Sequence, residues 1–204
     1  MPDRVRPWWP GLLAAALLVS VTACGTVTTS ARGPGGADLV VQDFYGRFGR
    51  QKGLAFLSLF TDSARFDIKG LSVSFVDRDG LARLADYAAA VHSRLAGREL
   101  EVSHDTVRCR FDETNDWLGL LGVKYASYDG WFRVSGARIA EARVSLTPQS
   151  SDELGGKVAG FVAWLQNQDP KALQRLFPGG RPAYDSNVVP ELISMLRQWQ
   201  SRVR

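Results

Sequence analysis

Cysteine and histidine are the side chains of this sequence with the widest chemical range, and each occurs twice, as Cys24, Cys109, His92 and His104. A catalytic thiol needs a base beside it, and nothing in the spacing ties either histidine to Cys109. His104 stands next to Asp105 among polar residues, so we expect it to lie in a loop and not to act in acid–base catalysis. The patterns His-x-His, His-Glu-x-x-His, Gly-x-Gly-x-x-Gly and Gly-x-Ser-x-Gly do not occur. We therefore predict no metal site and no cofactor.

Cys24 has a distinct context, because it ends an apolar run that follows Arg4 and Arg6. Residues 11–23 are apolar or small, and as a helix they would span roughly 20 Å, less than the ~30 Å hydrocarbon core. This layout is typical of a secretory signal peptide. The segment Val21-Thr-Ala-Cys24 also resembles the bacterial lipobox, whose cysteine is diacylated and becomes the mature N-terminus. We predict a signal peptide over 1–23 and a lipid anchor at Cys24. A plain signal peptide, or a short anchor with an incidental cysteine, is the alternative.

Residues 24–36 are rich in Gly, Ser and Thr and show no apolar periodicity, so we expect a flexible tether there. The anchor would hold the protein in the cell envelope, on the extracytoplasmic side of a bacterial membrane. Cys109 alternates with Val107 and Phe111, which predicts a buried structural thiol in a strand.

Composition excludes several classes of protein. The chain of 204 residues has 25 basic and 21 acidic side chains and a net charge of +4, too small to indicate nucleic-acid binding. With 45% hydrophobic residues the chain is globular, and its length fits one domain with an appendage.

Hydrophobic periodicity predicts the elements that must position the functional side chains. Helices are expected over 38–48, 54–60, 81–95, 153–168, 171–177 and 188–203, and strands over 64–68, 71–75, 100–111, 125–134 and 139–146. We expect Gly97 to end the third helix and residues 117–122 to form an apolar loop. The order predicts an α+β fold with an antiparallel sheet. Residues 149–152 read as a polar break before a C-terminal helical extension over 149–204. We expect its last helix to pack on the domain, and a membrane-surface position is the alternative.

Three segments carry a resemblance to a known superfamily. Phe44-Tyr-Gly-Arg-Phe48, Leu59-Phe-Thr-Asp-Ser-Ala-Arg-Phe-Asp-Ile68 and the helix and closing strands after them are similar to the nuclear transport factor 2-like superfamily. That superfamily includes ketosteroid isomerases and SnoaL-type polyketide cyclases. The resemblance covers residues 37–148 and implies a curved sheet wrapped with helices into a cone-shaped barrel around an apolar pocket.

The resemblance also implies where catalytic groups would lie. It points to Asp67 as the base, Tyr45 as the hydroxyl donor and Asp129 as the acid, but each stands one position away from its expected place. In a strand, a one-residue slip turns a side chain to the opposite face. An isomerase or cyclase that uses a pocket carboxylate is therefore the alternative and not the leading hypothesis.

Aromatic side chains are dense in the region of the expected cone, and apolar pockets are the default binding sites of uncharacterised domains. We expect the ligand-binding residues to be Phe44, Tyr45, Phe48, Phe66, Trp117, Tyr128 and Trp131. The leading hypothesis is a membrane-anchored protein that binds a small apolar ligand or a protein partner without catalysis. A homodimer is a third interpretation, because sheets of this superfamily often pair.

Overall fold

The computed structural model describes residues 36–69 and 73–203. The predicted signal peptide, the lipid anchor at Cys24 and nearly all of the tether lie outside the described residues, and their predictions remain untested.

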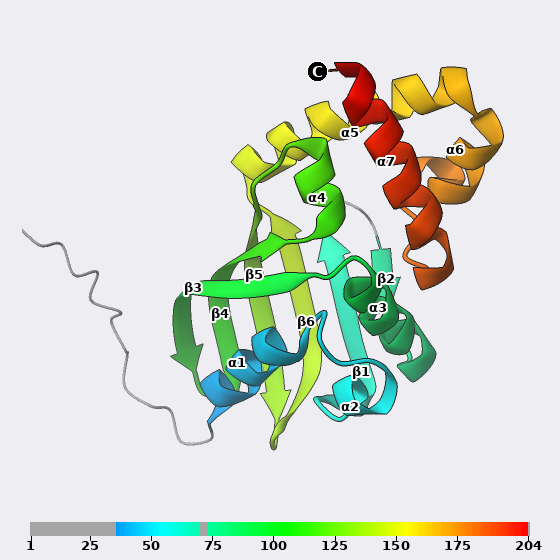
Figure 1. Cartoon of the computed structure of the whole chain (residues 1–204). Helices are drawn as coiled ribbons and strands as arrows, with labels where there is room; N and C mark the ends of the chain where they lie inside the picture. Colours follow the sequence, from blue (N-terminus) through cyan, green and yellow to red (C-terminus); the bar gives the residue numbers. More distant parts are fainter. Residues whose placement is uncertain (1–35, 70–72, 204) are drawn as a thin grey trace, which may run out of the picture.

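The described strands form one six-stranded sheet in the order β2-β1-β6-β5-β4-β3. Their bounds are β1 Phe60–Lys69, β2 Val73–Phe75, β3 Arg94–Ser103, β4 Thr106–Thr114, β5 Ala126–Ser135 and β6 Arg138–Leu146. All neighbouring pairs are antiparallel except β1 and β6, which run parallel. The α+β prediction is confirmed, with the difference that the sheet is mixed. It is strongly curved and stays open at the β2 and β3 edges (Figure 1).

The described helices form two groups (Figure 1). The first group, α1 Ala37–Arg47, α2 Gly53–Leu57 and α3 Arg78–Ala90, packs on the inner face of the sheet. The second group, α5 Pro148–Gln168, α6 Pro170–Leu176 and α7 Val189–Val203, gathers with the short α4 Asp116–Leu121 at the other end. None of the described helices is both long and apolar enough to span a membrane.

Phe44 of α1 lies at the centre of the inner core. Its ring contacts those of five other phenylalanines at centroid distances between 5.3 and 6.2 Å: Phe48, Phe56, Phe60, Phe66 and Phe132. The strands supply Phe60, Phe66 and Phe132 because alternate residues of a strand point to the same face. Cys109 lies in this core, and the prediction of a buried structural thiol is confirmed.

The C-terminal helices build a second core with α4. Leu118 and Leu121 are buried together with Phe161 and Leu165 of α5 and Leu196 of α7. The last helix therefore packs on the protein, as expected. The extension is joined to the sheet domain through shared apolar contacts.

The third helix is shorter than predicted. It ends at Ala90, and His92 adopts a left-handed conformation with φ 53°, after which Leu95 and Gly97 belong to β3. Leu95 fits a helical and a strand spacing equally well, which explains the wrong boundary. Gly97 does not end a helix. It makes room for Tyr45, whose ring would lie 2.9 Å from a Cβ at this position.

Two further segments were expected to be irregular and are helical. Residues 117–122 form most of α4 because the Asn115 side chain accepts a hydrogen bond from the Leu118 amide at 2.8 Å. Residues 149–152 form the first turn of α5, where Thr147 is the N-cap and Pro148 the first residue. In both cases a polar residue just before the segment caps the helix.

Candidate functional site

A small cavity of about 50 Å³ lies on the inner face of the sheet. Its wall is aromatic and aliphatic on most sides and polar at one end: Phe44, Phe48, Phe66, Ile68, Leu84, Tyr87, Ala88, Ser93, Leu95, Phe111, Glu113, Tyr128, Val144 and Tyr184. Ligand pockets usually measure about 300–1,000 Å³. In this conformation the cavity is therefore well below the size of a usual ligand pocket.

Glu113, near the end of β4, forms the polar end of the cavity. The Ser93 hydroxyl donates a hydrogen bond to Glu113 Oε1 at 2.6 Å, and Asn115 Nδ2 donates to the same oxygen at 2.9 Å. Both bonds end on Oε1. The second carboxylate oxygen takes part in neither of these bonds, and Tyr128 also lies within hydrogen-bond reach of the Glu113 carboxylate.

Three tyrosines surround the carboxylate: Tyr87 from α3, Tyr128 from β5 and Tyr184 from the segment between α6 and α7. Burial, and then the negative charge of Glu113, raise the pKa of Tyr128 and of Tyr184. Burial, and then Tyr184 and Glu113, raise the pKa of Tyr87. All three phenols therefore keep their protons at neutral pH and can donate hydrogen bonds.

Tyr184 forms part of the wall of the cavity. Its ring packs edge-on against Phe75 at a centroid distance of 5.7 Å and against Tyr87 at 5.0 Å. Next to it, Val189 at the start of α7 is buried against Tyr87 and Val91. The C-terminal extension therefore supplies one wall of a cavity that otherwise belongs to the sheet domain.

This arrangement can perform two kinds of chemistry. The aromatic walls favour an apolar body, while Glu113 and the tyrosine hydroxyls can hydrogen-bond one polar group of the same molecule. A carboxylate beside neutral phenols can also take a proton from a bound molecule while a phenol stabilises the resulting oxyanion.

The structure brings four of the predicted aromatic residues together at this cavity, Phe44, Phe48, Phe66 and Tyr128. Tyr45 lies beside it, with its ring 5.4 Å from that of Phe111. Burial and the neighbouring Cys109 thiol raise the pKa of Tyr45, and burial raises that of Cys109 to about 11. Both groups stay protonated at neutral pH.

Trp131 does not line the inner cavity but the hollow on the outer face of the sheet. Its neighbour Phe132 is the inward-facing residue of β5, so Trp131 faces outward and stacks with the Arg143 guanidinium at 4.9 Å. Trp117 is not on a loop and does not line the cavity. It is part of α4 and packs between the second core and the cluster of Tyr87, Val91 and Val189.

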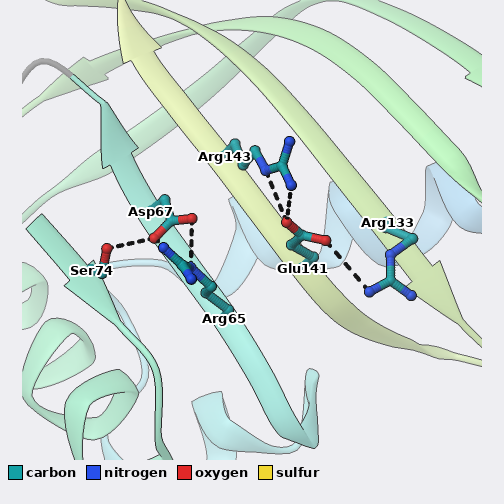
Figure 2. Close-up of polar contacts among 6 residues, drawn as sticks. All are labelled: Arg65, Asp67, Ser74, Arg133, Glu141 and Arg143. Atoms are coloured by element: carbon teal, nitrogen blue, oxygen red, sulfur yellow. Dashed lines mark hydrogen bonds and ion pairs between the residues drawn. The ribbon is translucent and has the colours of Figure 1, made fainter. Parts of the chain in front are cut away.

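The carboxylates implied by the resemblance also point away from the cavity. Phe66 faces inward and Asp67 faces outward, where it accepts hydrogen bonds from Arg65 Nε at 2.7 Å and the Ser74 hydroxyl at 2.6 Å (Figure 2). Burial opposes ionisation of Asp67, but these bonds outweigh it and lower its pKa. Asp129 lies on the same outer face and pairs with Arg110 at 3.0 Å. The one-residue slip therefore removes Asp67 and Asp129 from the cavity.

Glu113, Tyr87, Ser93 and Tyr184 were not predicted as site residues. A signal for Glu113 exists in the sequence, since it stands two residues after Phe111 and therefore shares its strand face. Tyr87 lies three residues after Leu84 on the apolar side of α3. Nothing local marks Tyr184, because its position follows only from the packing of the extension.

A wider hollow of about 440 Å³ lies on the outer face of the sheet. Among its charged residues, Arg110 pairs with both Asp129 and Glu99. Within residues 36–69 and 73–203, no group of three side chains is placed to hold a metal ion.

Comparisons with known proteins found likenesses of structure only. No family model and no curated protein matches the sequence. Among solved structures, the epoxide hydrolase/cyclase-like enzyme SalBIII is 12% identical with a TM-score of 0.48, over 56% of this chain and 92% of its own. A protein of ketosteroid isomerase-like fold from Catenulispora acidiphila is 11% identical with a TM-score of 0.47, over 58% and 90%. An NTF2-like protein from Anabaena variabilis is 14% identical with a TM-score of 0.47, over 58% and 95%. Fold does not imply function, and activity must be argued from the cavity itself.

Proposed function

We propose that this protein is a lipid-anchored, extracytoplasmic binding protein of the bacterial cell envelope. Its ligand is a small, mainly apolar molecule with one hydrogen-bonding group, taken into the cone without chemical change. The observation that carries this proposal is the polarity of the cavity, in which aromatic walls converge on Glu113 and three protonated tyrosines.

The small volume of the cavity sets a condition on this function. Since about 50 Å³ is too small for such a molecule, binding requires a side chain of the wall to move. Tyr184 is the best candidate because it comes from a connecting segment rather than from the sheet or α3. Connecting segments open at lower free-energy cost than core strands and helices.

Mass spectrometry of small molecules that co-purify with the membrane-extracted full chain tests this function. We expect a compound that is retained by the wild type and by Asp67→Asn but lost, or reduced about tenfold or more, from Glu113→Gln. Asp67→Asn is the matched control, since it changes a carboxylate on the outer face. Equal retention by both variants, or no bound compound in any of the three proteins, would contradict the proposal.

A second candidate function is proton abstraction next to a carbonyl group, with Glu113 rather than Asp67 as the base. The specific observation in its favour is a carboxylate inside an apolar cavity, next to phenols that can donate to an enolate oxygen. The test is deuterium uptake from heavy water by the small ketone 2-tetralone, followed by NMR. Catalysed uptake that disappears in Glu113→Gln and persists in Asp67→Asn would establish this chemistry, and uptake at the uncatalysed rate would exclude it for this ketone.

A further inference from the structure

The Tyr184 ring forms part of the cavity wall and is itself held by two other aromatic rings. It lies between Phe75 of β2 and Tyr87 of α3, at centroid distances of 5.7 and 5.0 Å and at interplanar angles of 85° and 61°. Edge-to-face packing at such distances is the favourable geometry for aromatic pairs. Phe75 and Tyr87 therefore hold a flat six-membered ring from two sides.

The polar end of the cavity can hydrogen-bond a phenol hydroxyl. Tyr184 lines the same cavity as Glu113 and Tyr128, so a carboxylate and a second phenol border the space next to its ring. A neutral phenol that meets a carboxylate forms a charge-assisted hydrogen bond, which is among the stronger kinds.

The segment that contains Tyr184 can move so that the Tyr184 side chain leaves the cavity wall. Gly179 and Gly180, on the α6 side, both have positive φ values, 62° and 78°. From there to α7 the chain has little regular structure. Its backbone bonds include those from the Arg181 amide to the Pro178 carbonyl at 3.3 Å and from the Ala183 amide to the Leu176 carbonyl at 2.9 Å, and one short turn follows at 186–188. Residues 181–185, which we call the strap, can therefore lift without unfolding a strand or a long helix.

We infer that Tyr184 is an internal stand-in for the ligand, and that the cavity takes a phenolic compound whose ring replaces the Tyr184 ring and whose hydroxyl meets Glu113 and Tyr128. This inference rests on the proposed binding function and names its ligand class. The ligand and the strap compete for one place, so the wild type binds such a compound only in the fraction of molecules whose strap is open.

The test uses p-cresol, which has the ring and hydroxyl of a tyrosine side chain, and toluene, which lacks the hydroxyl. Binding is measured by calorimetry on the purified full chain. We expect Tyr184→Ala to bind p-cresol at least about tenfold more tightly than the wild type and at least about tenfold more tightly than it binds toluene. In the double variant Tyr184→Ala/Glu113→Gln, p-cresol should weaken about tenfold or more while toluene is unchanged, because only the hydroxyl contact is altered.

The variant Pro182→Gly is a second test of the competition between strap and ligand, and it leaves every side chain of the cavity in place. It loosens the strap by widening the conformations open to the chain, so p-cresol should bind more tightly to this variant than to the wild type. The comparison holds even if Tyr184→Ala does not fold.

The outcomes separate the ligand class from the proposed function. Equal affinity of Tyr184→Ala for p-cresol and toluene would overturn the phenolic class but leave a binding cavity. Wild-type affinity for p-cresol equal to that of both Tyr184→Ala and Pro182→Gly would overturn the competition with the strap. Binding of neither compound by any variant would overturn both the inference and the proposed function.

Discussion

At the scale of single residues, the carboxylates of the sheet differ in how deeply they are buried. Asp112 is the most enclosed of the ion-paired carboxylates described here, with a side chain 8% exposed. It accepts a hydrogen bond from the Ser127 hydroxyl at 2.7 Å and pairs with Arg98, whose side chain is 53% exposed. Burial opposes its ionisation, but the bonds from Arg98 and Ser127 outweigh that effect and lower the pKa of Asp112 below its ordinary value of 3.8.

We expect Asp112→Asn to lower the free energy of unfolding at pH 7 by about 1–3 kcal/mol, since one partner of buried charged hydrogen bonds is lost. A carboxylate with a lowered pKa stabilises the fold above its unfolded-state pKa, and that contribution is lost as the pH falls through the folded-state value. The difference between variant and wild type should therefore shrink once the pH drops below 3.8.

Urea unfolding at pH 7 and at two values below pH 4 measures both effects. Asp129→Asn serves as the control, because this side chain is 50% exposed and exposed ion pairs contribute less than about 1 kcal/mol. A stability difference for Asp112→Asn that stays constant across this pH range would argue against the ionised carboxylate as its source.

The comparison of Asp67 with Glu113 shows which site residues can be predicted from the sequence alone. The two-residue period of a strand decides which face a side chain occupies, and the shift of Asp67 by one position was visible in the sequence. The same period places Glu113 with Phe111 and Cys109 on the inner face. The turn-like composition of residues 113–116 obscured this signal, because Asn115 and Asp116 begin a helix there.

At the scale of elements, α4 links the sheet domain to the C-terminal extension. Leu118 and Leu121 of α4 share a buried core with Phe161 of α5 and Leu196 of α7. Helix α4 directly follows β4, the strand that contains Glu113. A substitution that loosens this core therefore acts next to that strand.

We expect Leu196→Ala to lower the free energy of unfolding by about 2–5 kcal/mol, because Leu196 is fully buried and the substitution leaves a cavity. The shared core also predicts one cooperative transition for the sheet and the extension. Chemical denaturation followed by both tryptophan fluorescence and circular dichroism measures the loss and tests whether the two signals coincide.

Leu39→Ala is the matched control, since Leu39 on α1 is 54% exposed. Its effect should stay within about 0.5 kcal/mol. Two separate transitions in the wild type would mean that the extension folds independently of the sheet.

Most elements were predictable from hydrophobic periodicity, and the errors lie where tertiary contacts determine whether a segment forms a helix or a strand. Strands β5 and β6 and helix α7 match their expected ranges closely. The end of α3 at Ala90 was missed, since Leu95 satisfies both helical and strand spacing and only its pairing with Glu113 in the sheet decides between them.

At the scale of the whole molecule, the C-terminal extension contributes to the wall of the inner cavity. The resemblance covered residues 37–148 and left Tyr184 outside, although its ring lines the cavity and packs on Tyr87. A contact between residues almost a hundred positions apart has no local signature in a single sequence. The aromatic walls of the site could therefore be predicted, and the strand period also contained a signal for Glu113. The contribution of Tyr184 to the cavity could not be predicted.

The attachment of this molecule to a membrane remains a prediction from the sequence around Cys24. It requires the sulfur atom of Cys24 to carry a lipid. We expect Cys24→Ala to move the protein from the membrane to the soluble fraction, because the thiol that would carry the acyl chains is absent. Each buried methylene contributes about 0.8 kcal/mol, and stable anchoring takes about two chains, so the loss should be nearly complete. Fractionation of cells after an alkaline wash, followed by immunoblotting, measures it.

Cys109→Ala is the matched control, because that thiol is buried in the inner core and far from any acylation signal. It should leave the protein in the membrane fraction. If Cys24→Ala also stayed there, the apolar run at 11–23 or a partner would be holding the protein, and the lipid anchor would be wrong. The distinction affects the proposed function directly, since a tethered cavity samples only the compounds that reach the membrane surface.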